Sequence, residues 1–150
     1  MMRAPLLLVE DNKDDELLTL RALKKHNILN EIVIARDGAE ALDYLFGTGP
    51  YAGRDMHVMP QVVLLDLNLP RIGGLEVLRR VRENPATRYL AVVVLTSSKE
   101  DEDVIRSYSL GANSFVRKPV EFNEFVEAVK AVGLFWLVVH HGAPPRRDIE

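Results

Sequence analysis

Short, mainly apolar runs alternate along the chain with longer stretches of amphipathic pattern. Runs without a regular polar face are typical of strands that are covered on both sides in a parallel sheet. Because a helix-like stretch follows each run, strand and helix alternate five times. The runs predict five strands, over residues 6–9, 32–34, 61–66, 91–95 and 114–116.

The stretches between these runs predict five helices. Acidic residues follow the start of the first and fourth helices, and Lys24 and Lys25 lie near the end of the first, as the helix dipole favours. Asn84-Pro85 ends the third helix and Gly111 ends the fourth. The first two helices are expected over residues 14–26 and 38–46, the third carries the apolar stripe Leu75, Leu78 and Val81, the fourth begins after Ser98, and the last carries Phe122, Phe125, Val126 and Val129 on one face.

This alternation predicts a single α/β domain. The expected architecture is a doubly wound, five-stranded parallel sheet with helices on both faces. The only long irregular stretch covers residues 47–60. Its glycines formally fit a dinucleotide-binding fingerprint, but they follow a helix rather than a strand, so we interpret the stretch as a loop. We expect the domain to span residues 1–139 and residues 140–150 to form a flexible tail.

Composition excludes several classes of protein. The 150 residues are 47% hydrophobic, which is enough for one buried core. The formal net charge of −3 does not favour direct binding to nucleic acid. Since the chain has no cysteine, it cannot use thiol catalysis, cysteine-bound zinc, iron–sulfur clusters or disulfides. The apolar run at 6–9 is too short for a signal-peptide core or a membrane span, so we expect a soluble cytoplasmic protein.

Polar residues follow the predicted strands at the edge where a doubly wound sheet binds its ligands. The carboxylates of Glu10, Asp11 and Asp66 should meet there. Like charges brought together need compensation, and Mg²⁺ prefers one or two carboxylates, water and phosphate oxygens. Asp66 is the candidate nucleophile for a phosphoryl group, Lys118 would neutralise the phosphoryl oxygens, and the Thr96 hydroxyl would donate to one of them.

Four segments, in this order, resemble the receiver domain of two-component response regulators. They are Leu-Val-Glu-Asp-Asn at 8–12, Leu-Leu-Asp-Leu-Asn-Leu-Pro at 64–70, Val-Leu-Thr-Ser at 94–97 and Phe-Val-Arg-Lys-Pro at 115–119. The resemblance covers roughly residues 6–132 and implies the flavodoxin-like strand order 2-1-3-4-5. It also implies a phosphoacceptor protein of a phosphorelay, rather than an enzyme, in which a histidine kinase phosphorylates Asp66.

The resemblance assigns roles to further residues. Mg²⁺ would be held by Asp11, the side chain of Asp66 and the backbone carbonyl of Asn68, with Glu10 acting through water. Thr96 and Phe115 would form a switch pair, in which Phe115 rotates inward when Thr96 moves toward the phosphoryl group. The Lys118–Pro119 peptide bond would be cis.

A narrower resemblance concerns the kinase partner. Residues 43–49, residues 69–78 and the segment Gly-Leu-Phe-Trp-Leu at 133–137 are similar to small single-domain regulators that are paired with bacterial phytochromes. This similarity implies a phytochrome-type histidine kinase as the phosphodonor.

Two other functions remain open. A haloacid-dehalogenase-like phosphatase also uses a strand-end aspartate, but it would have a second acid two residues later, where this chain has Asn68. A degenerate receiver would act only as a protein-binding module, yet such a protein would usually have lost one of the five site residues, and all five are present here.

The segment 132–139 is apolar without a break, so it lacks a solvent-facing side. It could fold back over its own core, or it could pack against a second subunit. Large apolar side chains left exposed usually mark an interface. We therefore expect a homodimer in which Leu134, Phe135, Trp136 and Leu137 contact the partner subunit.

Overall fold

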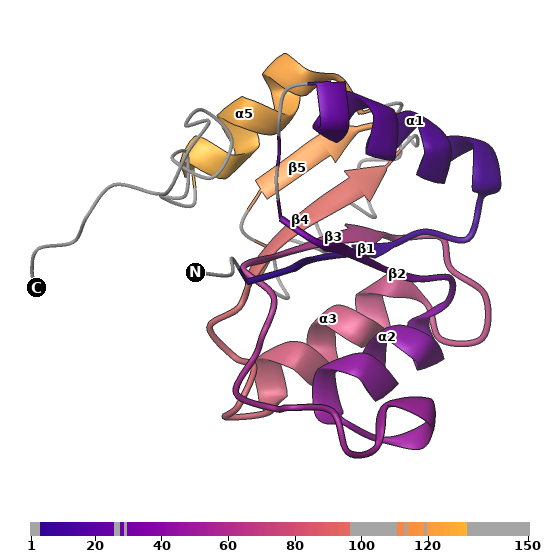
Figure 1. The fold of residues 1–150 in the computed structure, drawn as a ribbon, viewed down its shortest axis with the longest axis vertical. Coiled ribbons are helices and arrows are strands. Elements are labelled where there is room, and N and C mark those ends of the chain that lie inside the picture. Colours follow the sequence, from indigo (N-terminus) through magenta and orange to yellow (C-terminus); the bar gives the residue numbers. More distant parts are fainter. Residues whose placement is uncertain are drawn as a thin grey trace, which may run out of the picture.

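A parallel five-stranded sheet organises the computed structural model, which describes residues 4–25, 28, 30–96, 111–112, 114–118 and 120–131. The strands pair in the order β2-β1-β3-β4-β5, and every pair is parallel (Figure 1). The predicted fold class and strand order are therefore confirmed. The elements are β1 (Leu6–Val9), α1 (Lys13–Lys25), β2 (Ile32–Ala35), α2 (Gly38–Phe46), η1 (Gly49–Tyr51), β3 (Val62–Asp66), α3 (Gly74–Glu83), β4 (Ala91–Thr96), β5 (Ser114–Arg117) and α5 (Phe122–Ala131).

The helices cover both faces of the sheet. Figure 1 shows α1 and α5 on one side and α2 and α3 on the other. Successive residues of a strand point to opposite faces, which is why all four residues of β1 are fully buried. Leu6 and Leu8 join the core that contains Leu23 of α1 and Phe125 of α5. Leu7 and Val9 join the second core, with residues of α2 and α3.

Several element boundaries differ from those predicted. β2, β4 and β5 each continue one residue further, because each pairs with its neighbour to the end of the register. β3 begins at Val62 rather than at residue 61. α1 begins one residue earlier, at Lys13. The predicted fourth helix, the Lys118–Pro119 bond and the apolar segment 132–139 lie outside the described residues.

The stretch interpreted as a plain loop contains a short helical turn. The 3₁₀ helix η1 begins at Gly49, with Pro50 in its first turn. Proline is tolerated there because its missing N–H would have no partner inside the helix. Gly47, which ends α2, has the left-handed φ of 67° that favours glycine at this position.

Among the described helices, none combines the length and the apolar character that a membrane span requires.

Candidate functional site

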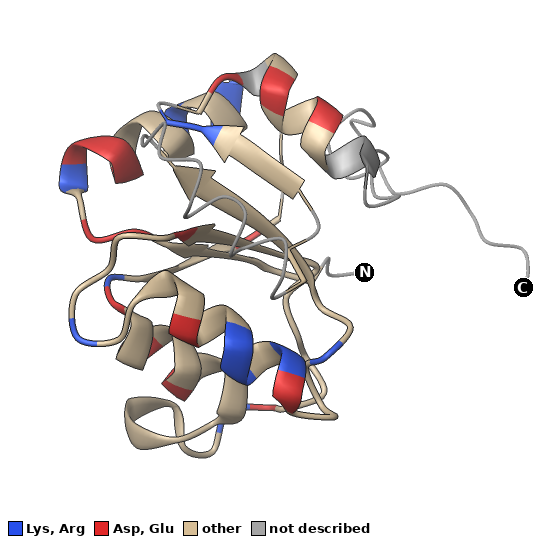
Figure 2. Cartoon of the chain, turned by 180° about the vertical axis from the view of Figure 1, so that it is seen from behind, with Lys and Arg blue, Asp and Glu red and all other residues tan. Residues whose placement is uncertain are grey.

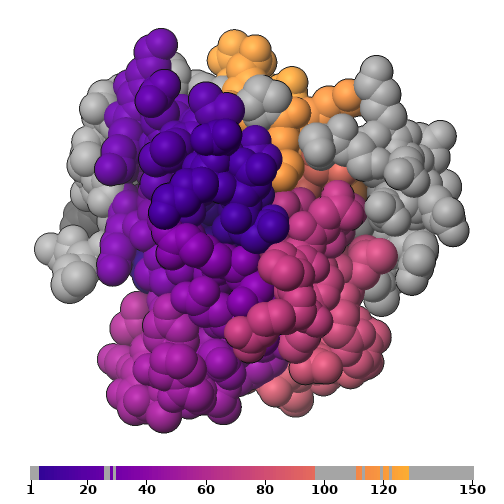
Figure 3. All heavy atoms as spheres, turned by 90° about the vertical axis from the view of Figure 1, so that its right-hand side faces the viewer, coloured from indigo at the N-terminus to yellow at the C-terminus, as the bar shows by residue number. Residues whose placement is uncertain are grey.

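The functional side chains lie at the carboxyl edge of the sheet. Glu10 follows β1, Asp66 and Thr96 are the last residues of β3 and β4, and Lys118 follows β5. The parallel register brings these strand ends together, with Asp66 opposite Leu95 and Thr96 opposite Arg117. Figure 3 views the molecule from this side: the indigo residues after β1 adjoin the pink residues after β3 and the orange residues near β5 and α5.

Lys118 is the centre of the site. Its side chain is only 8% exposed, and its Nζ lies 3.1 Å from Asp66 Oδ2 and 3.2 Å from both carboxylate oxygens of Glu10. Its Nζ also lies 3.0 Å from Oδ2 of Asp15, a residue of the first turn of α1. The backbone N–H of Lys118 donates to the carbonyl of Thr96 at 3.0 Å, which fixes the base of the side chain to β4.

Sequence reasoning placed Lys118 at the same edge of the sheet as Asp66, but it did not predict the contact with Asp15. The three acids at the start of α1 have an evident explanation in the helix dipole. Nothing in their spacing distinguishes Asp15 from Asp14. The contact of Asp15 with Lys118 depends on how the first turn of α1 is placed relative to the end of β5. Figure 2 shows the acidic start of α1 in red, beside the segment that leads into it.

The carboxylates form a group that fits a divalent cation. Glu10, Asp11 and Asp66 each offer one oxygen, and these oxygens lie within 4.8 Å of one another. Glu10 and Asp66 are 0% and 2% exposed, whereas Asp11 is exposed. Hard oxygen ligands with one open side suit a Mg²⁺-type ion that keeps part of its water shell. The donor set therefore fits the metal that the sequence implies.

The raised pKa of Glu10 shows that its negative charge is unfavourable in this site without a further cation. Burial and then the nearby Asp66 carboxylate raise the pKa of Glu10 from 4.5 to about 7, although Lys118 and the N–H of Asn12 act in the opposite direction. Burial by itself lowers the pKa of Lys118, but the carboxylates of Asp15, Asp66 and Glu10 outweigh this effect, so the net shift is upward. The single ammonium of Lys118 thus faces two buried carboxylates and a partly exposed one, so it does not fully compensate their charge.

The loop after β3 fixes the orientation of the Asp66 carboxylate. The backbone N–H of Asn68 donates to Asp66 Oδ1 at 3.1 Å, while Oδ2 accepts from Lys118. Both oxygens are therefore already oriented by hydrogen bonds. The Asn68 side chain is exposed. This is consistent with its assigned role, in which the backbone carbonyl and not the side chain would bind Mg²⁺.

The two expected switch residues lie on adjacent strands. Thr96 is buried at the end of β4. Phe115 is opposite Val94 in β5, is half-buried and packs against the core on the α2 and α3 side. The residues expected at a subunit interface, Leu134, Phe135, Trp136 and Leu137, lie outside the described part of the chain.

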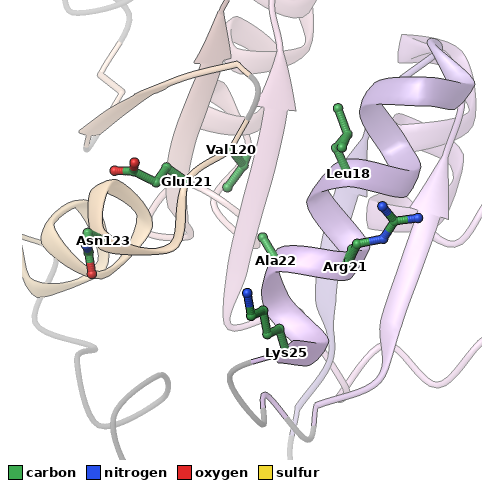
Figure 4. Close-up of a pocket in the computed structure, with 7 residues that line it drawn as sticks. All are labelled: Leu18, Arg21, Ala22, Lys25, Val120, Glu121 and Asn123. Carbon is green, nitrogen blue, oxygen red and sulfur yellow. The ribbon is translucent and has the colours of Figure 1, made fainter.

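A groove lies between α1 and the start of α5 (Figure 4). It has a volume of about 370 Å³ and is lined by Leu18, Arg21, Ala22, Lys25, Val120, Glu121 and Asn123. Two residues of its lining follow site residues closely in the sequence: Leu18 is three residues after Asp15, and Val120 is two after Lys118. Leu18 is 42% exposed although it is apolar.

This fold and site match one family of signalling proteins. The family model of the response regulator receiver domain matches residues 6–130. The chain belongs to this family, and the phosphatase alternative is not favoured.

Particular relatives are also similar over most of their length. The bacteriophytochrome response regulator AtBRR is 55% identical, with a TM-score of 0.83 over 91% of this chain and 96% of that chain. The response regulator Rcp1 of Synechocystis sp. is 39% identical over 132 residues, which are 88% of this chain and 88% of Rcp1. The Mn²⁺-bound form of Rcp1 gives a TM-score of 0.74 at 37% identity, over 96% of this chain and 100% of that one. The phosphorylated cyanobacterial phytochrome response regulator RcpA gives 0.73 at 34% identity, over 96% and 99%.

Proposed function

We propose that Asp66 accepts a phosphoryl group from the phosphohistidine of a kinase, in the presence of Mg²⁺. The observation that carries this proposal is the position of the Asp66 carboxylate, which is 2% exposed, hydrogen-bonded at both oxygens and adjacent to Lys118 and to two further acids. In the transfer, a carboxylate oxygen of Asp66 forms the new bond to phosphorus. The bond from phosphorus to the histidine nitrogen breaks, and the imidazole leaves with its electron pair.

The residues around Asp66 divide the work of transfer. Asp11, the Asp66 side chain and the Asn68 carbonyl would hold Mg²⁺, which supplies charge compensation for the incoming phosphoryl oxygens. Glu10 supports this group from its buried position. The Lys118 ammonium binds a phosphoryl oxygen, and the Thr96 hydroxyl donates to another once the acyl phosphate has formed. Movement of Thr96 toward that oxygen would leave space into which Phe115 rotates, and this rotation would carry the signal to a partner.

Acetyl phosphate tests the acceptor directly. The protein is incubated with acetyl phosphate and Mg²⁺, and intact mass is measured. We expect the addition of one phosphoryl group, and its loss in Asp66→Asn or with EDTA. Asp55→Asn is the matched control because Asp55 lies in the exposed loop before β3, outside the site. Full labelling of Asp66→Asn would remove Asp66 from this role.

The proposed kinase partner is of the phytochrome type, and this choice is supported by the relatives AtBRR and RcpA, whose names link them to phytochromes. Because the kinase draws its phosphoryl group from ATP, we place the exchange in the cytoplasm. A bacteriophytochrome kinase, phosphorylated with ATP, should transfer to this protein faster than an unrelated histidine kinase does. Equal rates from both kinases would contradict the pairing.

We propose that the groove between α1 and α5 receives this kinase. A protein phosphodonor has to bring its histidine to Asp66, so it must cover the surface around the site. The groove is a candidate for this contact because Leu18 and Val120, which line it, closely follow Asp15 and Lys118 in the sequence. Leu18→Asp should slow transfer from the kinase by about tenfold and leave labelling by acetyl phosphate unchanged. Val58→Asp is the matched control, since Val58 is 43% and Leu18 42% exposed. Equal slowing in both variants would exclude the groove.

The proposed homodimer through residues 134–137 is tested separately. Sedimentation of the full-length protein at micromolar concentration should show a dimer, and truncation after residue 131 should give a monomer. A monomeric full-length protein would overturn the proposal.

A further inference from the structure

Lys118 has three N–H bonds and faces three carboxylates. An ammonium group can donate one hydrogen bond through each N–H. Glu10, Asp66 and Asp15 all lie between 3.0 and 3.2 Å from Nζ, and the contact with Asp15 is the shortest of the three. The three N–H groups of the Lys118 ammonium are therefore matched by three carboxylates. Glu10 follows β1, Asp66 ends β3 and Asp15 lies in the first turn of α1.

Asp15 differs from the other two partners in its surroundings. Glu10 and Asp66 belong to the group of acids whose oxygens converge on one point, and Asp15 does not belong to it. The side chain of Asp15 is 29% exposed, so it sits at the rim of the site rather than in its interior. Asp15 is thus not one of the three converging acids that would bind a cation, although its partner Lys118 contacts two of them.

The start of α1 holds Asp15 in this position. The side chain of Asn12 accepts from the N–H of Asp15 at 2.9 Å, and the N–H of Asn12 donates to Glu10 Oε2 at 3.3 Å. The first turn of α1 is therefore connected to Glu10 at one end and presents the Asp15 carboxylate to Lys118 at the other. A carboxylate fixed by its backbone can hold a flexible lysine side chain at small entropic cost.

We propose that Asp15 is a positioning residue that holds the Lys118 ammonium beside Asp66 while the phosphodonor binds. This inference rests on the proposed phosphoacceptor function. When Asp66 becomes an acyl phosphate, Lys118 shifts a hydrogen bond to a phosphoryl oxygen, and the contact with Asp15 keeps the ammonium at the rim from which the phosphoryl group enters. Asp15 acts through Lys118 and does not touch the reacting atoms.

Two roles for Asp15 predict opposite kinetic results. A carboxylate that only adds negative charge would repel the phosphodonor, so Asp15→Ala would lower the acetyl phosphate concentration for half-maximal rate and leave the maximal rate unchanged. A positioning carboxylate sets the maximal rate, which should fall about tenfold in Asp15→Ala. Asp15→Glu, which retains the charge and the acceptor, should recover part of it.

Asp14→Ala is the matched control. Asp14 is an exposed acid of the same helical turn, so its loss makes the same change in charge and in the helix dipole. We expect wild-type labelling kinetics for this variant. A loss in Asp14→Ala equal to that in Asp15→Ala would assign the effect to helix charge and overturn the proposal.

Two measurements do not depend on phosphotransfer. In ¹⁵N-lysine-labelled protein, the Lys118 ammonium signal should be observable in the wild type and should broaden by faster hydrogen exchange in Asp15→Ala. Beryllofluoride, a stable phosphoryl analogue, should bind about tenfold more weakly to Asp15→Ala with Mg²⁺ present. An unchanged ammonium signal in Asp15→Ala overturns the inference, even if acetyl phosphate labels the wild type. A different outcome would overturn the proposed function instead: the wild type takes up no phosphoryl group, but its Lys118 ammonium signal still changes in Asp15→Ala. Asp15 would then remain the residue that positions Lys118.

Discussion

Gly74 packs directly against the strand end that carries Asp66. A Cβ on Gly74 would lie 2.7 Å from the Cα of Leu67 and closer still to the carbonyl oxygen of Asp66. The N–H of Gly74 donates to the carbonyl of Leu67 at 3.1 Å. The first residue of α3 therefore holds the backbone of the proposed phosphoacceptor, and only a residue without a side chain fits there.

Gly74→Ala should destabilise the protein by about 1–3 kcal/mol, because the added methyl group meets backbone that cannot move without displacing Asp66. Urea unfolding measures the loss, and labelling by acetyl phosphate should slow as well. Gly73→Ala is the control, since a Cβ at the neighbouring Gly73 meets nothing within 4 Å. Its stability should change by no more than about 0.5 kcal/mol. Similar losses in both variants would contradict the packing argument.

The sequence was sufficient to predict the sheet and the acids at its edge, for a physical reason. A strand covered on both faces must be apolar along its length, so the acids of residues 10, 11 and 66 mark the places where burial ends. Parallel strands end at one edge, and this rule brings residues far apart in sequence to one place. Lys118 lies 108 residues after Glu10, and the two side chains are in contact.

Contacts made by the first turns of the helices could not be predicted in the same way. In the sequence, nothing distinguishes Asp15 from the acids beside it, and only the structure shows its contact with Lys118. In the same way, only the structure shows that Leu67 lies against Gly74 and not against Gly73. Gly38 is a similar case, because a Cβ there would lie 2.7 Å from the carbonyl carbon of Ile72. Each of these roles depends on the distance between two elements, and no local pattern of residue types encodes that distance.

The raised pKa of Glu10 predicts that Mg²⁺ stabilises the protein more at high pH. With a pKa of about 7 in the folded state and 4.5 as its ordinary value, Glu10 holds a proton that the unfolded chain releases. The stability of the metal-free protein should therefore fall as the pH rises from about 4.5 to about 7 and stay lower above that. A bound cation removes this penalty, so Mg²⁺ should raise the Tm more at about pH 8 than at about pH 5.5. In Glu10→Gln the two increases should become similar, and a pH dependence that persists unchanged would assign the effect to another group.

Lys118→Met should be strongly destabilising in the absence of Mg²⁺. The variant leaves the buried carboxylates of Glu10 and Asp66 without their cation, a change that typically costs about 3–5 kcal/mol. Because protonation of a carboxyl relieves the repulsion, urea unfolding should show a larger loss at about pH 8 than at about pH 5.5. Lys24→Met, in the exposed part of α1, should change the stability by no more than about 0.5 kcal/mol. A loss for Lys118→Met as small as this would mean that the ion pairs contribute little.

Arg54 organises the connection between α2 and β3. Its Nε donates to the carbonyl of Tyr44 at 2.8 Å, and its Nη1 donates to the carbonyl of Val58 at 2.7 Å. The guanidinium carbon lies 4.1 Å from the centre of the Tyr44 ring, which in turn meets the Tyr51 ring edge-on. One planar cation thus joins the end of α2 to the loop that follows it.

Arg54→Lys should therefore lower stability without affecting the phosphoacceptor. A lysine has the charge but not the fork of donors, so it cannot bond both carbonyls while it covers the ring. The loss of such bonds costs about 1–2 kcal/mol, equivalent to a fall of a few degrees in Tm for a domain of this size. Labelling by acetyl phosphate should keep its wild-type rate. Arg88→Lys is the control because Arg88 is exposed and its guanidinium carbon lies 5.9 Å from the Tyr89 ring. An equal loss of Tm in both variants would show that the fork of Arg54 does not hold the loop.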